Sequence, residues 1–111
     1  MLLPTLAAAQ DGRAVFEARC ASCHAVDRAA PPGPGPNLGG VVGRAVGGNA
    51  GFDYSPVLEA ARASGQVWDR ARLEQFLEDP EEMYPGLWMG GNGLRRPADR
   101  AAVVEYLSRG G

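Results

Sequence analysis

Four stretches of the chain carry hydrophobic residues at helical spacing, and segments rich in glycine and proline separate them. The pattern predicts helices at residues 12–20, at 56–63, between 69 and 79, and from 97 onward. Asp11, Ser55 and Asp69 precede three of these stretches and are candidate N-caps. Pro56 and Pro97 suit the first position of a helix, where no amide hydrogen is needed.

The hydrophobic residues of these stretches fall on one side of the expected helices. The predicted buried positions are Val15 and Phe16, then Leu73, Phe76 and Leu77, and finally Val103, Tyr106 and Leu107. The segments at 29–36, 39–51 and 81–96 hold most of the glycine and proline and are expected to be loops. No strand pattern or repeat occurs, so residues 11–111 are predicted to form a single all-α domain.

Length and charge narrow the classes of protein that the chain can represent. Its 111 residues suffice for one domain, but the apolar core of so small a domain is marginal by itself. The formal net charge is −2, and all 11 basic residues are arginine because the chain has no lysine. This weakly acidic balance argues against a nucleic-acid partner.

Residues 1–10 resemble the end of a secretory signal, because a short apolar run is followed by small residues suited to cleavage. We expect them to be a signal-peptide remnant or a disordered extension. This predicts a bacterial protein secreted across the inner membrane into the periplasm. No stretch of the sequence approaches the ~20 apolar residues that a membrane-spanning helix needs, so the protein is not expected to span a membrane.

Cys20, Cys23 and His24 are the only cysteines and the only histidine of the chain. They form the run C-x-x-C-H, the attachment site of a c-type haem, in which the thiols add to two vinyl groups and the histidine ligates the iron. A helical turn places both sulfurs on one face, as such an attachment requires. A haem also explains the long loops, because they can lie over the cofactor instead of packing on protein.

Three other interpretations of this run are weaker. A zinc site needs about four ligands, and the sequence offers no further cysteine or histidine. A redox pair of the thioredoxin type usually follows a strand in a βαβ unit, whereas helix is predicted before Cys20. A structural disulfide between residues three apart closes too short a loop to add much stability.

Further motifs surround the C-x-x-C-H run. They are Gly12 and Phe16 before it, then Gly35-Pro36-Asn37-Leu38, Val42-Gly43-Arg44, Gly51-Phe52-Asp53-Tyr54-Ser55, Trp68, Pro85-Gly86-Leu87-Trp88-Met89 and Tyr106-Leu107. In this order they resemble class I cytochrome c, in the group that contains mitochondrial cytochrome c and bacterial cytochrome c2. The resemblance implies four to five short helices wrapped around one covalently attached haem, with the N- and C-terminal helices crossing.

The resemblance implies roles for several residues around the haem. The carbonyl of Pro36 would accept a hydrogen bond from the ring of His24, which fixes the tautomer and raises the basicity of the ligand. Arg44, Tyr54 and Trp68 would surround the inner haem propionate and would neutralise it or donate hydrogen bonds to it.

The resemblance also implies that Met89 is the sixth iron ligand. Phe76 stands where many relatives have a tyrosine that hydrogen-bonds the ligand sulfur. The composition agrees, because a chain with one histidine and no lysine leaves a methionine as the sixth ligand, or an open site. Met89 follows a Pro–Gly turn in a loop that can cross the distal face of the haem, whereas Met83 is expected to fill a gap in the core.

The predicted function is that of a soluble, monomeric one-electron carrier and not of an enzyme, because iron with six ligands has no site for a substrate. The expected partners are redox proteins: a reductase and an oxidase, a dehydrogenase or a photosynthetic reaction centre. Trp88 is predicted to form an apolar contact at the haem edge, or else to pack inward. Two alternatives stay open: the haem subunit of a periplasmic oxidoreductase, and a ligand-binding or peroxidase-like protein if Met89 is labile.

Overall fold

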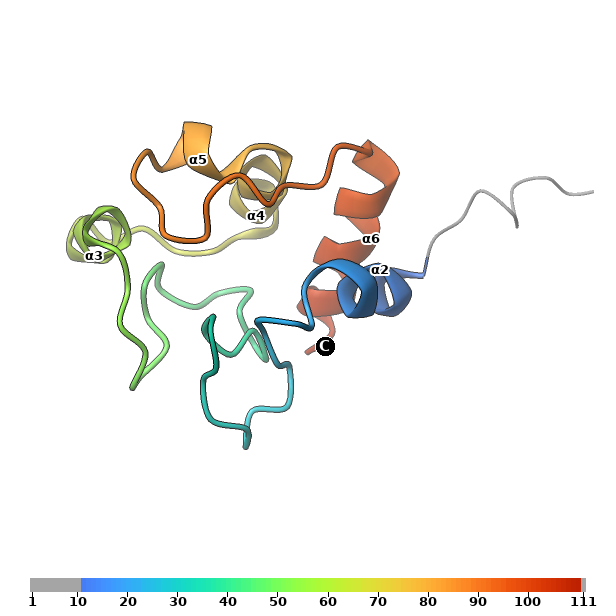
Figure 1. Ribbon diagram of the computed structural model, residues 1–111, viewed down its shortest axis with the longest axis horizontal. Helices are drawn as coiled ribbons and strands as arrows, with labels where there is room; N and C mark the ends of the chain where they lie inside the picture. The colour runs from blue at the N-terminus through green and yellow to red at the C-terminus, as the bar shows by residue number, and fades with distance from the viewer. Residues whose placement is uncertain (1–10, 111) are drawn as a thin grey trace, which may run out of the picture.

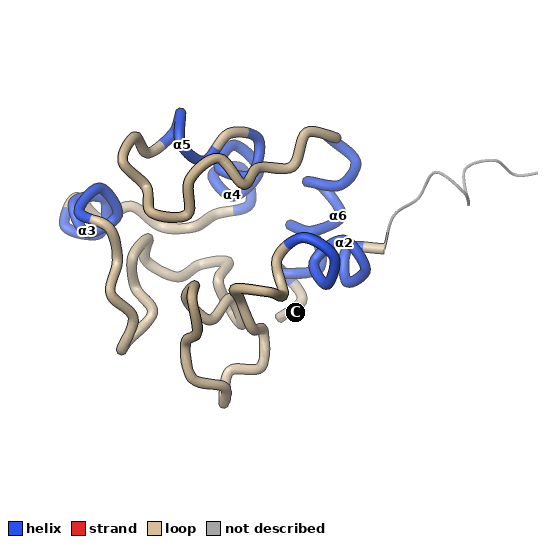
Figure 2. Tube along the Cα trace, in the orientation of Figure 1, coloured by secondary structure: helices blue, strands red, loops and turns tan. Residues whose placement is uncertain are grey.

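The computed structural model describes residues 11–110, which contain five helices, one isolated β-bridge between Ala45 and Val67, and long loops (Figure 2). The helices are α2 (Gly12–Arg19), α3 (Pro56–Ala63), α4 (Arg70–Glu78), α5 (Pro80–Met83) and α6 (Pro97–Ser108). The helices and the loops between them surround the middle of the molecule (Figure 1). The prediction of a signal-peptide remnant concerns residues 1–10 and lies outside the described residues.

The four predicted helices are present and begin within one residue of the expected positions, and α5 is an additional helix. Asp79 ends α4 and also begins α5, because its side chain accepts a hydrogen bond from the amide of Glu82. Pro80 then takes the first position of α5. The prediction that residues 81–96 are entirely loop is therefore wrong at 81–83, where the short helix continues.

The candidate N-caps differ in what their side chains do. Asp11 accepts a hydrogen bond from the amide of Arg13, and Asp69 accepts one from the amide of Arg72, so both predicted caps are confirmed. Ser55 precedes α3 as expected, but its side chain makes no capping hydrogen bond. Its hydroxyl is buried instead, which bears on the functional site.

The terminal helices α2 and α6 pack across one another, and Figure 1 shows them together on the right-hand side of the molecule. Gly12 lies at the contact. A Cβ atom at this position would come within 2.8 Å of the Tyr106 Cβ and would overlap the carbonyl of Ala102. The ring of Phe16 packs against the ring of Tyr106, with centroids 5.6 Å apart. The crossing of the two helices is confirmed, and it requires glycine at position 12.

The buried side of α6 includes a charged residue. Arg100, Val103, Val104 and Leu107 are all buried and follow the i, i+3, i+4, i+7 spacing of one helix face. Tyr106 is only partly buried.

Across residues 11–110, no helix is both long enough and apolar enough to cross a lipid bilayer.

Candidate haem site

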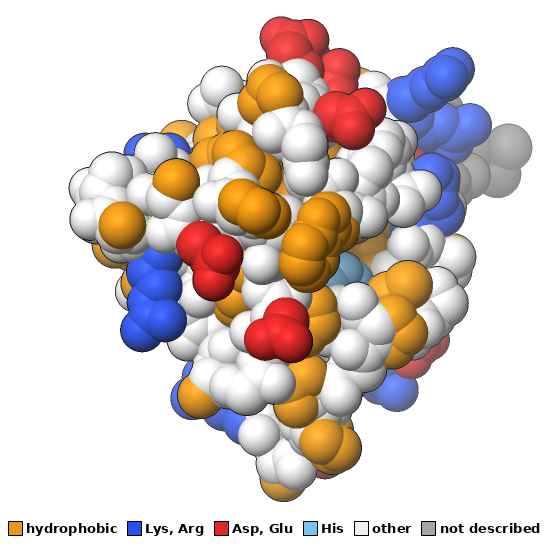
Figure 3. Space-filling model, turned by 60° about the vertical axis from the view of Figure 1, so that its left-hand side comes forward, with side chains coloured by type: hydrophobic (Ala, Val, Ile, Leu, Met, Phe, Trp, Pro, Cys, Tyr) orange, Lys and Arg blue, Asp and Glu red, His pale blue; other side chains and the backbone are white. Residues whose placement is uncertain are grey.

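A cavity of about 480 Å³ lies in the middle of the molecule and is lined by residues of α2, α3, α4 and α6 and of the loops between them. The lining includes all nine residues singled out from the sequence: Cys20, Cys23, His24, Pro36, Arg44, Tyr54, Trp68, Phe76 and Met89. The space-filling view shows the single histidine at the bottom of a crevice between hydrophobic side chains (Figure 3). Folding therefore brings together residues from most of the length of the chain.

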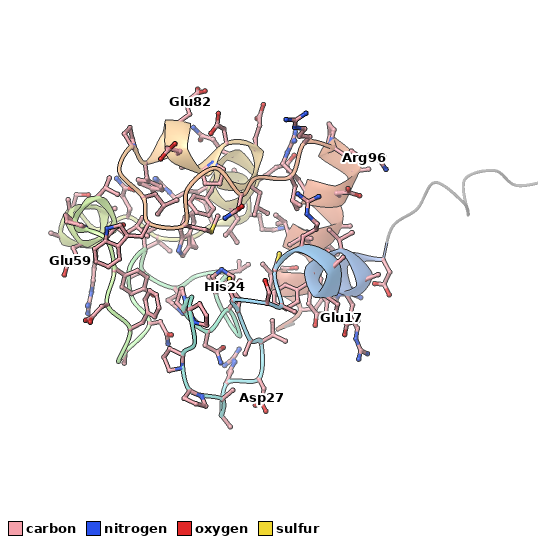
Figure 4. All side chains as sticks on the ribbon, viewed as in Figure 1. Glu17, His24, Asp27, Glu59, Glu82 and Arg96 are labelled. Carbon is pink, nitrogen blue, oxygen red and sulfur yellow. The ribbon has the colours of Figure 1, made fainter. Side chains whose placement is uncertain are left out.

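The imidazole of His24 points toward the middle of the molecule, at the end of the turn that follows α2 (Figure 4). Its amide donates to the carbonyl of Cys20 at 2.9 Å, which continues the turn of the C-x-x-C-H run. The ring Nδ1 lies 2.8 Å from the Pro36 carbonyl oxygen and donates a hydrogen bond to it. Burial lowers the pKa of His24, and the bond to Pro36 acts in the opposite direction. A neutral ring with a proton on Nδ1 leaves Nε2 free to bind a metal ion.

Gly35 provides the space in which the imidazole lies. A Cβ atom on Gly35 would come within 2.7 Å of Nδ1 and 2.9 Å of Nε2 of His24, and would overlap the ring. Gly33 in the same loop differs, because a Cβ there would meet only the Cys23 carbonyl oxygen, at 3.8 Å. The orientation of the histidine ring thus depends on the absence of a side chain at position 35.

Both cysteine side chains line the cavity, and they do not form a disulfide with each other. Cys20 is partly buried and Cys23 is exposed. Burial raises the pKa of the Cys20 thiol, while the neighbouring Arg19 acts to lower it. The two thiols therefore border the cavity that also contains the His24 ring, as a doubly attached haem requires.

Arg44 forms part of one wall of the cavity. Its Nη1 and Nη2 donate to the carbonyl oxygens of Asn37 and Gly39, each at 2.5 Å. Burial lowers the pKa of Arg44; nearby Arg28 contributes in the same direction, and Tyr54 opposes it. The guanidinium is thus held by backbone carbonyl groups beside the cavity.

Tyr54 and Trp68 line the cavity together with Arg44. The Tyr54 hydroxyl oxygen accepts a hydrogen bond from the amide of Asn49 at 2.9 Å. Burial raises the pKa of Tyr54, whereas Asn49 and Arg44 act to lower it. Trp68 is buried, and its ring packs edge-on against Phe76 with a centroid distance of 5.0 Å. The polar and aromatic groups expected around a propionate thus line the same cavity.

Ser55 is a site residue for which the sequence predicted a helix cap and membership of a family motif, but no role in the site. It is 2% exposed, it lines the cavity, and its hydroxyl has no hydrogen-bond partner among the described residues. An unpaired buried hydroxyl costs about 1–3 kcal/mol. A haem combines a large apolar ring with two carboxylates, so it fits a cavity with apolar walls and unsatisfied polar groups such as this hydroxyl.

Met89 is partly buried in the loop between α5 and α6. The Met89 carbonyl accepts a hydrogen bond from the side-chain amide of Asn92 at 2.7 Å. The amide of Leu94 donates to the carbonyl of Leu77 at 2.7 Å, which ties the end of the loop to α4. Met83 is also partly buried, but it packs against the core and does not line the cavity.

The end of the loop is also held by Arg100, which the sequence analysis does not single out. Nη1 of Arg100 donates to the carbonyl oxygens of Leu94 and Arg95, at 2.9 and 3.0 Å. A signal was available, because Arg100 occupies the first position of the apolar i, i+3, i+4, i+7 series on α6. A charged residue at such a position needs a buried hydrogen-bond partner.

Trp88 precedes Met89, lines the cavity and is 67% exposed. The alternative in which this side chain packs inward is therefore wrong. Neighbouring Leu87 is buried, so the loop turns one hydrophobic side chain into the core and the next toward solvent.

Comparison with known proteins agrees with this arrangement. The Cytochrome c family profile matches residues 9–110. The chain is 42% identical to cytochrome c2 of Rhodomicrobium vannielii, over 87% of this chain and 74% of that protein. It is 40% identical to cytochrome c 2.1 of Caenorhabditis briggsae over 88% and 84% of the two chains, and 35% identical to cytochrome c2 of Agrobacterium tumefaciens over 86% of each.

The fold and the cavity define a small all-α protein built around a covalently bound cofactor. The chain belongs to the cytochrome c family. It is a monohaem c-type cytochrome that carries electrons, and the two cysteines of its C-x-x-C-H run are Cys20 and Cys23.

Proposed function

We propose that this cytochrome is a one-electron carrier whose haem iron is ligated by His24 and Met89. The observation that carries the proposal is that both side chains line one cavity, although they come from segments at opposite ends of the chain. No lysine or second histidine occurs in the sequence to compete for the sixth position. The electron-carrying relatives support a carrier over an enzyme.

The haem supplies a one-electron iron couple, and a thioether ligand favours its reduced form. The chain contributes a rigid surrounding. The rings of Trp68, Phe76 and Tyr84 contact one another, with centroid distances of 5.0, 6.2 and 6.0 Å. The Tyr84 hydroxyl donates to Gln66 Oε1 at 2.6 Å. Such interlocked packing resists rearrangement when the charge of the site changes.

The partners proposed here are redox proteins that dock where Trp88 is exposed beside the cavity. Arg19 is also exposed and lines the cavity. A lysine-free surface cannot provide a ring of ammonium groups to steer docking, so the contact should rely on apolar area. We place the protein in the periplasm because residues 1–10 resemble the end of a secretory signal.

The matched substitutions Met89→Ala and Met83→Ala test the proposed ligation. Met89→Ala should abolish the weak red absorption band of methionine-ligated ferric iron and lower the reduction potential by more than about 100 mV, because axial ligands set haem potentials over a wide range. Met83→Ala should retain both properties, because this side chain packs against the core. An unchanged band in Met89→Ala would refute the assignment. A wild-type protein without the band that binds carbon monoxide freely would support the ligand-binding alternative.

A further inference from the structure

A cluster of polar side chains lies at the start of the loop between α5 and α6. Tyr84 is buried, and its hydroxyl donates to Gln66 Oε1 at 2.6 Å. Nη1 of Arg72, on α4, donates to the same oxygen at 3.0 Å and lies 3.5 Å from the Tyr84 hydroxyl oxygen. All of these side chains lie outside the lining of the haem cavity. The cluster joins α4, the residues between α3 and α4, and the end of α5.

The side-chain oxygen of Gln66 is the shared acceptor of the cluster, so its members depend on one another. Among the ion pairs of residues 11–110, none involves Arg72, and its buried Nε has no hydrogen-bond partner within that range. The guanidinium therefore relies on Gln66, as the Tyr84 hydroxyl does. A buried polar network of this kind favours one arrangement, because a displaced member leaves its partners unsatisfied.

Tyr84 also fixes the path of the chain toward Met89. Its carbonyl oxygen accepts a hydrogen bond from the amide of Leu87 at 3.0 Å, which closes a turn at Pro85 and Gly86. The φ of +90° at Gly86 suits the third residue of a type II turn. Leu87 is buried, and Met89 follows two residues later. A displacement of Tyr84 would therefore move the turn and shift Met89.

The middle of the loop between α5 and α6 is more exposed than its ends. Trp88 and Asn92 are exposed, whereas Tyr84 and Leu94 are buried. Arg100 holds the far end, because its Nη1 donates to the carbonyl oxygen of Leu94 at 2.9 Å. Exposed backbone with few buried contacts opens most easily, so the contacts at the two ends determine how firmly the middle of the loop is held.

We propose that Tyr84, held by Gln66 and Arg72, is a positioning residue that keeps Met89 on the haem iron. This role rests on the proposed ligation by Met89. An added ligand binds the iron only after Met89 has left it, so the apparent affinity for that ligand rises with the fraction of protein in which Met89 is detached. A weaker anchor at Tyr84 raises this fraction. Imidazole is a suitable probe, because it is small and its ring nitrogen ligates iron.

Titration of the ferric holoprotein with imidazole, followed by the loss of the red methionine band, tests this role. We expect imidazole to bind Tyr84→Phe about fivefold more tightly than the wild type, the effect of one neutral hydrogen bond. Tyr106→Phe removes the same hydroxyl from the contact between α2 and α6, and should bind imidazole like the wild type. Unchanged affinity in Tyr84→Phe, or an equal gain in both variants, would overturn the proposal.

Two substitutions of Gln66 separate the hydrogen bonds from the packing. Gln66→Leu removes the shared acceptor and should bind imidazole more tightly than Tyr84→Phe does, because Arg72 and Tyr84 both lose a partner. Gln66→Glu keeps an acceptor for both and should retain the wild-type affinity. Equal gains in Gln66→Glu and Gln66→Leu would contradict a role for these hydrogen bonds.

The red band of the wild-type protein before titration distinguishes failure of this role from failure of the proposed function. A wild-type protein without the band would refute ligation by Met89, and the role of Tyr84 with it. A wild-type protein with the band, together with unchanged imidazole affinity in Tyr84→Phe, would refute the role of Tyr84 alone.

Discussion

The substitution Gly35→Ala should disturb the proposed iron ligand without removing any atom of it. The added methyl group would lie within 2.7 Å of Nδ1 and 2.9 Å of Nε2 of His24, and would overlap the ring. The imidazole must move, and its 2.8 Å hydrogen bond to the Pro36 carbonyl must lengthen or break. Loss of that bond makes the imidazole a poorer electron donor, which disfavours the oxidised iron.

Two free energies set the expected size of the effect. Overpacking by one methyl group typically costs about 1–3 kcal/mol of unfolding free energy. A neutral hydrogen bond contributes about 0.5–1.5 kcal/mol. We take the hydrogen bond to stabilise the oxidised state by about 1 kcal/mol more than the reduced state. Its loss then raises the reduction potential by about 40 mV, since for one electron 59 mV corresponds to a tenfold change in the equilibrium constant between the two states.

Redox titration and chemical denaturation of the holoprotein measure both effects, and Gly33→Ala is the matched control. A methyl group on Gly33 meets only the Cys23 carbonyl oxygen at an ordinary 3.8 Å. This control should keep the wild-type potential and should not lose stability, because alanine reduces the entropy of the unfolded chain. Equal potentials in the two variants would refute the argument that Gly35 sets the His24–Pro36 contact.

Three further substitutions have definite expected outcomes. Gly12→Ala should lower the free energy of unfolding of the holoprotein by about 1–3 kcal/mol, because the methyl group overlaps the carbonyl of Ala102; a gain in denaturation midpoint would contradict the close contact of α2 and α6. Ser55→Ala should cost the holoprotein about 1 kcal/mol if the orphan hydroxyl donates to a haem carboxylate, and unchanged stability would show that it does not. Trp88→Ala should slow electron transfer to a redox partner by about tenfold, because losing an aromatic contact that contributes about 1.4 kcal/mol weakens docking by that factor. The salt dependence of the rate should change little. Equal stopped-flow rates for the variant and the wild type would place the docking contact elsewhere.

Local signals in the sequence were enough to predict most helices. Asp11 and Asp69 cap α2 and α4 as expected, because a side-chain carboxylate before an apolar series is a short-range signal. The short helix α5 escaped prediction because Asp79 both ends α4 and caps α5. A residue that can serve two helices gives the same local pattern as one that serves a single helix.

The sequence predicted the site residues that belong to recognisable motifs, but it missed residues whose role depends on tertiary contacts. The nine residues singled out from the sequence line one cavity, yet the resemblance assigned no role to the hydroxyl of Ser55. Capping and cavity-lining serines look alike in sequence, and only the folded chain shows that this hydroxyl lacks a partner.

A redox titration of the purified wild-type holoprotein, followed by visible absorption, tests whether His24 and Met89 ligate the haem iron. Ligation by these two residues predicts a reversible one-electron transition of a single c-type haem, with the red band of methionine ligation present in the oxidised protein and lost on reduction. A transition without that band, from iron that binds carbon monoxide without displacing a ligand, would contradict ligation by His24 and Met89.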